Sequence, residues 1–271
     1  MKNIMTLVLE VTRRCNMHCE HCLRGDFEDC CMDADYNMIP EIFNGVESIG
    51  CITFTGGEPS LNHEFITACV DYIEKKDIYV GGVFIATNGL IYCQELVDAV
   101  RRLWLRNIMY SFRSNKVHYS GNGLSDYCGR YESASINQVK SFVEDECCMF
   151  SIAVSMDRFH ESIPLENYLK YLTCGFYSDS KVSNMTDSQI IPRGRGMDVA
   201  DGRNNRNISE MYFDDDGNPE EVYVSCDGRV FAECDLSFEM MNDENAIGTI
   251  VPGQESLENI LFKAWQEYLD A

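Results

Sequence analysis

Short β-rich runs alternate with helix-like stretches through the first 200 residues, and this alternation constrains the fold more than any other feature. Strands that alternate with helices form βαβ units, which place parallel strands in one sheet. We expect strands at 4–11, 51–55, 80–86, 108–112, 149–155 and 189–191, and helices at 39–48, 63–75, 94–103, 135–144 and 165–173. About six units precede Asp201, fewer than the roughly eight of a closed barrel. The pattern predicts an α/β fold, a partial (β/α)6 TIM-like barrel, with an open doubly wound sheet as the alternative.

The pattern changes beyond Asp201. Two short strands are expected at 221–224 and 229–232, joined by a turn at Asp227-Gly228, and an amphipathic helix is expected at 256–269. Acidic residues are concentrated in the same part of the chain. We therefore divide the chain into a barrel over 1–200 and a small, acidic α+β C-terminal cap over 201–271.

The charge balance is strongly acidic, with 22 lysines and arginines against 44 aspartates and glutamates, a net charge of −22. A chain of this charge repels phosphate backbones, so nucleic acid is not expected as a partner. No apolar run approaches the roughly 18 residues that a membrane span requires. The amino terminus carries no secretory signal, and we expect a cytoplasmic protein.

Fourteen cysteines are an unusual number, and clustered thiols in a cytosolic protein indicate metal binding or redox chemistry. Cys15, Cys19 and Cys22 have the spacing C-x3-C-x2-C and follow the first predicted strand. Three thiolates on one loop can hold three irons of a [4Fe–4S] cluster and leave the fourth iron without a protein ligand. An open position on a metal is typical of a reactive site. His18 and His21 lie among these cysteines, so a Cys3His zinc site is the alternative.

Two polar segments follow the next predicted strands. Gly56-Gly57-Glu58-Pro59 follows the second strand, and Thr87-Asn88-Gly89 follows the third. Glycines let the backbone approach a ligand closely, and a carboxylate can accept a charge-assisted hydrogen bond from an ammonium group. Each segment alone is an ordinary turn, but ligands of α/β proteins bind at the carboxyl ends of the strands.

Together, and in this order, these motifs resemble the radical S-adenosylmethionine (radical SAM) superfamily. The resemblance implies a [4Fe–4S] cluster on Cys15, Cys19 and Cys22, with the open iron chelated by the amino and carboxylate groups of SAM. It implies that one electron from the cluster cleaves SAM to methionine and a 5′-deoxyadenosyl radical, which abstracts a substrate hydrogen. A reductant such as flavodoxin or ferredoxin is then an expected partner.

The resemblance also implies which residues bind SAM. The methionine ammonium would be held at Gly56, Gly57 and Glu58, and the adenosyl group would lie near Thr87 and Asn88. Further candidates, all at or near predicted strand ends, are Ser111, Arg113, Ser155, Asp157 and Arg195, with His160 a candidate proton shuttle or substrate ligand. Each of these further candidates has an ordinary alternative, namely helix capping, surface exposure or neutralisation of the acidic cap.

The cap resembles a truncated SPASM or twitch extension, on the basis of Cys226, Cys234 and the residues that follow them. Such extensions bind auxiliary iron–sulfur clusters, so a second cluster at these two cysteines is one hypothesis. The other is a pair of thiols facing each other on a small hairpin. The cap has only two cysteines, fewer than the full pattern.

We therefore expect a radical SAM enzyme, and the resemblance of the cap favours a peptide or protein substrate. Two alternatives remain open: a radical SAM enzyme acting on a small metabolite or nucleotide, and a non-catalytic iron–sulfur or zinc protein. Glu58 with its glycines distinguishes the catalyst, because an electron carrier has no need for them.

Overall fold

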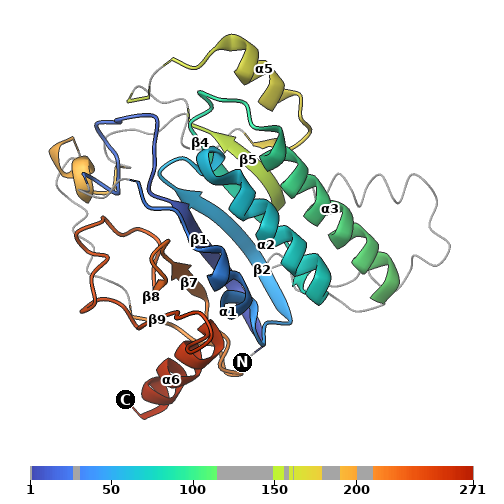
Figure 1. Cartoon of the computed structure of the whole chain (residues 1–271), viewed down its shortest axis with the longest axis vertical. Coiled ribbons are helices and arrows are strands. Elements are labelled where there is room, and N and C mark those ends of the chain that lie inside the picture. Colours follow the sequence, from blue (N-terminus) through green and yellow to red (C-terminus); the bar gives the residue numbers. More distant parts are fainter. Residues whose placement is uncertain are drawn as a thin grey trace.

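A computed structural model describes residues 2–26, 31–114, 149–155, 159–160, 162–178, 190–199 and 210–270. Within these residues the strands form one sheet in the order β6-β5-β4-β2-β1-β7-β8-β9, with β3 beside β2 (Figure 1). The strands are β1 (Asn3–Thr12), β2 (Ser48–Gly56), β3 (Tyr79–Val80), β4 (Val83–Thr87), β5 (Phe150–Val154), β6 (Tyr177–Ser178), β7 (Glu221–Val224), β8 (Arg229–Phe231) and β9 (Gly248–Thr249).

The sheet is parallel from β6 through β7, and only the β7–β8 and β8–β9 pairs are antiparallel. In the part of the chain that the structure describes, β6 and β9 end the sheet without pairing to each other, so the sheet is open. This confirms the predicted α/β class with an incomplete, parallel-dominated barrel.

Helices cover one face of the sheet. They are α1 (Ile39–Phe43), α2 (His63–Lys76), α3 (Gln94–Ser114), α5 (Leu165–Leu172) and α6 (Leu257–Asp270), with short 3-10 turns η1 (Tyr36–Met38), η2 (Pro59–Asn62) and η7 (Gly194–Asp198). Helices α2 and α3 run side by side (Figure 1). The predicted apolar face of α2 is buried, at Phe65, Ile66, Cys69, Val70 and Ile73. Burial of each phenylalanine, isoleucine or valine side chain in this set contributes about 1.5–3 kcal/mol to stability.

The predicted strand at 108–112 is wrong, because these residues form the last turns of α3. A short apolar run at the end of a helix has the same composition as a buried strand, and periodicity does not separate the two. The predicted helix at 39–48 stops at Phe43, since Asn44 is extended and β2 begins at Ser48.

The sixth parallel strand is also not where it was expected. Residues 190 and 191 are not in a strand, and the partner of β5 is the short strand β6. The predicted helix at 135–144 lies outside the described residues.

The C-terminal segment joins the same sheet as the rest of the chain. Strand β7 pairs in parallel with β1, on the side opposite β2. Val8 faces Tyr223, Leu236 and Met241 in a small second core, whereas Leu7 and Leu9 face the helices. Alternate residues of a strand point to opposite faces, so the second core lies on the face that the helices leave uncovered, whereas α6 of the cap packs into the main core. The domain boundary at residue 200 stays a prediction.

No helix in the described ranges is both long enough and apolar enough to span a membrane.

Candidate functional site

Four parallel strands end at one edge of the sheet. Thr12 of β1 is in register with Gly56 of β2, and Thr87 of β4 is in register with Val154 of β5. The segments that follow these strands therefore converge. They line a cavity of about 290 Å³, and its walls include Cys15, Cys19, Cys22, Glu58, Asn88 and Ser155.

The three cysteines of the loop after β1 share this cavity. Cys15 is exposed, Cys19 and Cys22 are half-buried, and all three also line an adjoining cavity of about 340 Å³. The donor set of three thiols on one loop, facing a cavity, fits a [4Fe–4S] cluster with one iron left open.

The three thiols are not all as close together as ligands of one zinc ion would be. Zinc with bonds of about 2.3 Å to sulfur would hold thiolates roughly 3.8 Å apart. Among the described residues, the three thiols do not all lie within 4.8 Å of one another, nor does His18 or His21 join them in such a group. His21 instead packs against the rings of Phe159 and His160, at centroid distances of 4.8 and 4.9 Å.

Arg195 hydrogen-bonds to the loop that carries Cys15, Cys19 and Cys22, here called the cysteine loop. Its Nε donates to the carbonyl oxygen of Cys19 at 2.9 Å, and its backbone N–H donates to that of Cys22 at 3.0 Å. Arg195 also pairs with Asp26. Gly194 permits this close approach, because a Cβ there would lie 2.4 Å from the carbonyl oxygen of Leu23. Arg195, which was predicted to contact the cofactor, therefore holds the loop of Cys15, Cys19 and Cys22 in place. Its side chain lines the cavity of about 340 Å³ and not the cavity that contains Glu58.

Glu58 is buried, at 1% exposure, and its carboxylate ties two segments together. Oε1 accepts from the N–H of Ser60 at 3.0 Å and from the hydroxyl of Thr87 at 2.7 Å. Oε2 accepts from the N–H of Asn88 at 2.8 Å. A carboxylate offers about four acceptor sites, so these three bonds leave one for a ligand.

The glycines before Glu58 have a structural role that sequence reasoning missed. A Cβ on Gly56 would lie 2.2 Å from the carbonyl oxygen of Thr12, and one on Gly57 equally close to that of Arg14. Gly57 also donates its N–H to the Thr12 carbonyl oxygen at 2.8 Å. The glycines therefore allow close contact with the backbone that enters the cysteine loop.

Asn88 links the segment after β4 to the cysteine loop. Its Nδ2 donates to Oδ1 of Asn16 at 2.6 Å, and its own Oδ1 accepts from the N–H of Leu90 at 3.0 Å. Thr87 is buried and lines the cavity with Asn88. Asn16 was not singled out from the sequence, although its position next to Cys15 was a signal.

Ser155 and His160 also reach the cavity. Ser155 follows β5, donates its N–H to the carbonyl oxygen of Thr87 at 2.9 Å, and lines the wall beside Asn88. His160 lines the same wall. Asp157 lies outside the described residues.

Ser111 and Arg113 do not follow a strand. Both lie in the last turns of α3, whose Asn107 donates to the carbonyl oxygen of Val80 at 3.0 Å, on the amino side of β4. The cavity lies at the carboxyl end of β4, so the reason for assigning these two residues to it is removed.

Cys226 and Cys234 lie at opposite ends of the β7–β8 hairpin. Cys226 is in the turn, and the N–H of Cys234 donates to the side chain of Glu221 at the start of β7. Strand β8, which lies between them, has three residues and therefore spans roughly 10 Å at about 3.3 Å per residue. Burial raises the pKa of both thiols, that of Cys234 to about 12. The structure therefore does not bring this pair together to bind an auxiliary cluster.

Two buried arginines beside the cysteines were missed, because arginine is ordinarily a surface residue. Arg24 lines both cavities, donates to the carbonyl oxygen of Cys234 at 2.9 Å, and lies over the ring of Tyr223. Arg13 pairs with Glu10 at 3.3 Å and with Asp227 at 3.0 Å. The arginines anchor both ends of the cysteine loop to the cap.

Comparison with known sequences identifies one family. Residues 9–116, which contain the three cysteines, Glu58 and Asn88, match the family described as the radical SAM superfamily. A tungsten-containing aldehyde ferredoxin oxidoreductase cofactor-modifying protein of Pyrococcus furiosus is 31% identical over 109 residues, 39% of this chain and 30% of that protein. An uncharacterized protein of Methanocaldococcus jannaschii is 32% identical over 100 residues, 36% and 35% of the two chains. The matches span about a third of these relatives.

Comparison with solved structures finds distant similarities. Streptococcus suis SuiB bound to the precursor peptide SuiA aligns with 97% of this chain and 65% of its own, with 15% identity and a TM-score of 0.39. The protein anSMEcpe with bound AdoMet aligns with 98% of this chain and 82% of its own, with 13% identity and a TM-score of 0.41.

Proposed function

We propose that the chain, whose residues 9–116 match the radical SAM superfamily, is an iron–sulfur enzyme that binds SAM and removes hydrogen from a peptide or protein. One observation supports this proposal above the others. Cys15, Cys19 and Cys22 line the same cavity as Glu58 and Asn88, although they come from different parts of the chain.

In this proposal the three thiolates hold a [4Fe–4S] cluster, and the cavity beside them receives SAM. When bound there, such a cluster would supply an open iron for SAM and the electron for the reductive cleavage of SAM, which would yield the hydrogen-abstracting radical. Glu58 accepts a hydrogen bond from the methionine ammonium with the acceptor site that Ser60, Thr87 and Asn88 leave free. Because Glu58 is already fixed by three bonds, it meets the ligand without reorganisation.

Four of the remaining candidate residues line the cavity wall, and a fifth, Arg195, does not. Thr87, Asn88, Ser155 and His160 line the wall, where the adenosyl group and the substrate would lie. Arg195 holds the cysteine loop from outside, through the carbonyl oxygen of Cys19. It is therefore a positioning residue.

A peptide or protein is the proposed substrate, and the net charge of −22 favours a basic or neutral one. The same charge disfavours a polyanionic nucleotide. A flavodoxin or ferredoxin is the proposed electron donor and the cytoplasm the proposed location.

The test is anaerobic reconstitution with iron and sulfide, followed by dithionite and SAM. We expect 5′-deoxyadenosine from the parent chain and none from Cys19→Ala. The matched control is Cys51→Ala, a half-buried cysteine on β2 away from the cavity, which keeps the activity. Equal product from Cys19→Ala and the parent would overturn the proposal.

A further inference from the structure

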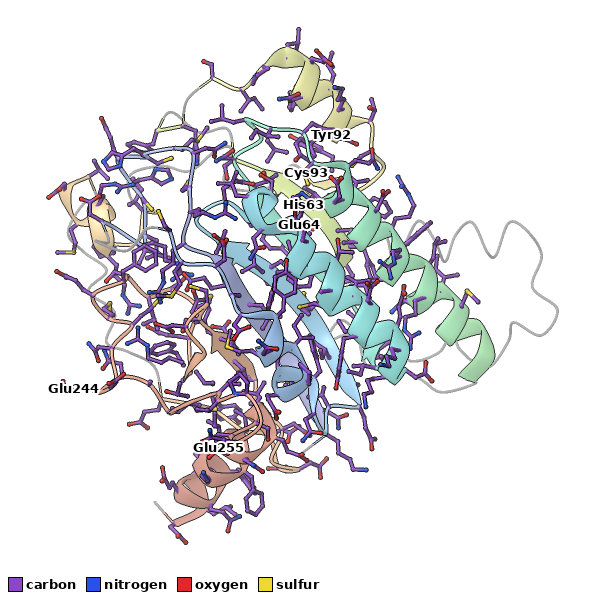
Figure 2. All side chains as sticks on the ribbon, in the orientation of Figure 1. His63, Glu64, Tyr92, Cys93, Glu244 and Glu255 are labelled. Atoms are coloured by element: carbon purple, nitrogen blue, oxygen red, sulfur yellow. The ribbon has the colours of Figure 1, made fainter. Side chains whose placement is uncertain are left out.

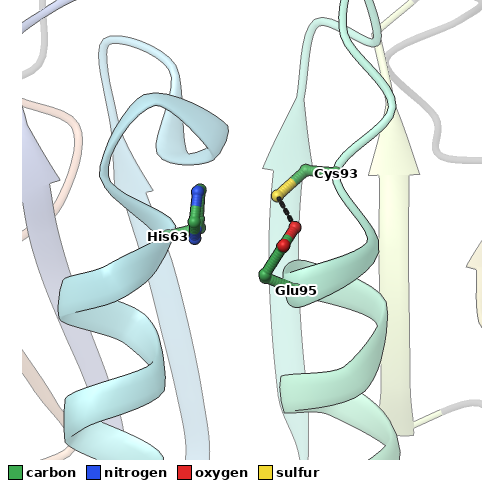
Figure 3. Close-up of side chains that lie close together, drawn as sticks. All are labelled: His63, Cys93 and Glu95. Atoms are coloured by element: carbon green, nitrogen blue, oxygen red, sulfur yellow. Dashed lines mark hydrogen bonds between the residues drawn. The ribbon is translucent and has the colours of Figure 1, made fainter.

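Three side chains of types that can bind metal ions lie close together outside the cavity. A nitrogen of His63, the sulfur of Cys93 and a carboxylate oxygen of Glu95 all lie within 4.8 Å of one another. Figure 3 shows the three side chains facing each other between α2 and α3, with Cys93 joined to Glu95 by a hydrogen bond of 3.3 Å. In Figure 2, His63 and Cys93 lie at neighbouring ends of α2 and α3, away from Glu244 and Glu255 of the cap.

The fold brings these residues together from two segments of the chain. His63 is the first residue of α2, Cys93 immediately precedes α3, and Glu95 lies in the first turn of α3. The N–H of Cys93 donates to the buried hydroxyl of Tyr171 at 3.1 Å, which fixes the backbone of Cys93. The group is therefore held by packed elements, and only short side-chain rotations separate its donors.

We propose that His63, Cys93 and Glu95 bind a divalent transition-metal ion, zinc in the first instance, with water as the fourth ligand. An imidazole nitrogen, a thiolate and a carboxylate are all established zinc ligands. Tetrahedral zinc places its ligand atoms roughly 3.3–3.8 Å apart. Cys93 and Glu95 already lie 3.3 Å apart, and the other separations, all within 4.8 Å, need to shorten by no more than about 1.5 Å. The thiol proton, which now points at Glu95, passes to solvent as the Cys93–metal bond forms.

Charge is consistent with this site. The positive ends of α2 and α3 oppose a cation, but the Cys93 thiolate and the Glu95 carboxylate together balance a divalent ion.

The position of the site gives the metal a structural role. His63 is five residues beyond Glu58, and Cys93 is five residues beyond Asn88. A metal ion would clamp the distal ends of the two segments that the Glu58–Asn88 hydrogen bond already joins at the cavity wall. The metal site does not depend on whether the cavity takes SAM.

Cobalt(II) is the probe, because a thiolate ligand gives it a charge-transfer band. The parent for this test is Cys15→Ser/Cys19→Ser/Cys22→Ser, which removes the cluster thiols. We expect one cobalt ion per chain with a thiolate band, loss of the band in Cys93→Ser, and at least about tenfold weaker binding in His63→Ala. Cys51→Ser, the matched control, keeps the band.

A second measurement covers the case in which the triple variant fails to fold. The cluster-loaded natural sequence is incubated with zinc and desalted, and its zinc content is compared with that of Cys93→Ser by mass spectrometry. We expect about one more zinc ion per chain in the natural sequence than in the variant. Equal zinc contents, or a cobalt band that persists in Cys93→Ser, would overturn the metal site.

Discussion

The replacement Glu58→Gln tests the buried hydrogen-bond network at the cavity wall. In the native chain Oε1 accepts from Ser60 and Thr87, and Oε2 accepts from Asn88. The best orientation of a glutamine keeps the two bonds at Oε1 and points its NH2 group at the N–H of Asn88. One hydrogen bond to a charged acceptor is lost, which costs about 1.5–3 kcal/mol, and a buried N–H is left facing another donor. We therefore expect a destabilisation of about 3 kcal/mol.

The assay is urea unfolding of the metal-free chain under reducing, oxygen-free conditions. The matched control is Glu64→Gln, whose side chain is 65% exposed at the start of α2. Surface replacements of this kind change stability by no more than about 0.5 kcal/mol. If Glu58→Gln and Glu64→Gln unfold at the same urea concentration, the network does not stabilise the fold and the reasoning is refuted.

Three further predictions concern the cysteine loop and its anchors. Gly57→Ala places a Cβ 2.2 Å from the carbonyl oxygen of Arg14, and we expect a loss of about 2 kcal/mol in thermal unfolding. Arg195→Lys keeps the charge but loses the Nε bond to Cys19, so we expect less iron per chain after reconstitution and desalting. Burial opposes ionisation of Asp227, but Arg229, Ser225 and Arg13 outweigh it and lower its pKa to about 2. Because the pKa is lowered, ionised Asp227 stabilises the fold at pH values above its unfolded pKa near 3.9, and this stabilisation is lost as the pH falls towards 2. We therefore expect Asp227→Asn to remove about 2 kcal/mol from the free energy of unfolding, all of it from the part that the parent chain loses on acidification.

Each of these predictions has a result that contradicts it. Gly57→Ala with parental stability would mean that the Arg14 backbone moves aside freely. Arg101→Lys, on an arginine of α3 whose side chain is 42% exposed, is the control for Arg195→Lys, and equal iron retention in the two would remove the bracing role. The Asp227 argument would be refuted if the free energy of unfolding fell as steeply in Asp227→Asn as in the parent chain between pH 5 and pH 2.

The sequence was sufficient to predict that the motifs meet at one edge of a sheet. Strands that alternate with helices must be parallel, so segments after β1, β2, β4 and β5 share an edge whatever their sequence. Composition was not sufficient to separate the end of α3 from a strand, because residues 108–112 are mostly apolar in either case.

Side-chain contacts between distant segments were beyond sequence reasoning. Arg195 resembles a ligand-binding arginine by position, but its guanidinium bonds to Cys19 and Gly25 carbonyl oxygens. Gly57 resembles a ligand contact by position, but the group that lies where its Cβ would be is the backbone of Arg14. Each of these outcomes depends on which segments pack against the cysteine loop, and no local pattern encodes that packing.

The most direct measurement of the central claim is low-temperature EPR of the reconstituted, dithionite-reduced chain with and without SAM. The account predicts a [4Fe–4S]+ signal that changes shape when SAM is added and that is lost in Cys19→Ala. A chain that gives no such signal, or one whose signal is identical with and without SAM, contradicts it.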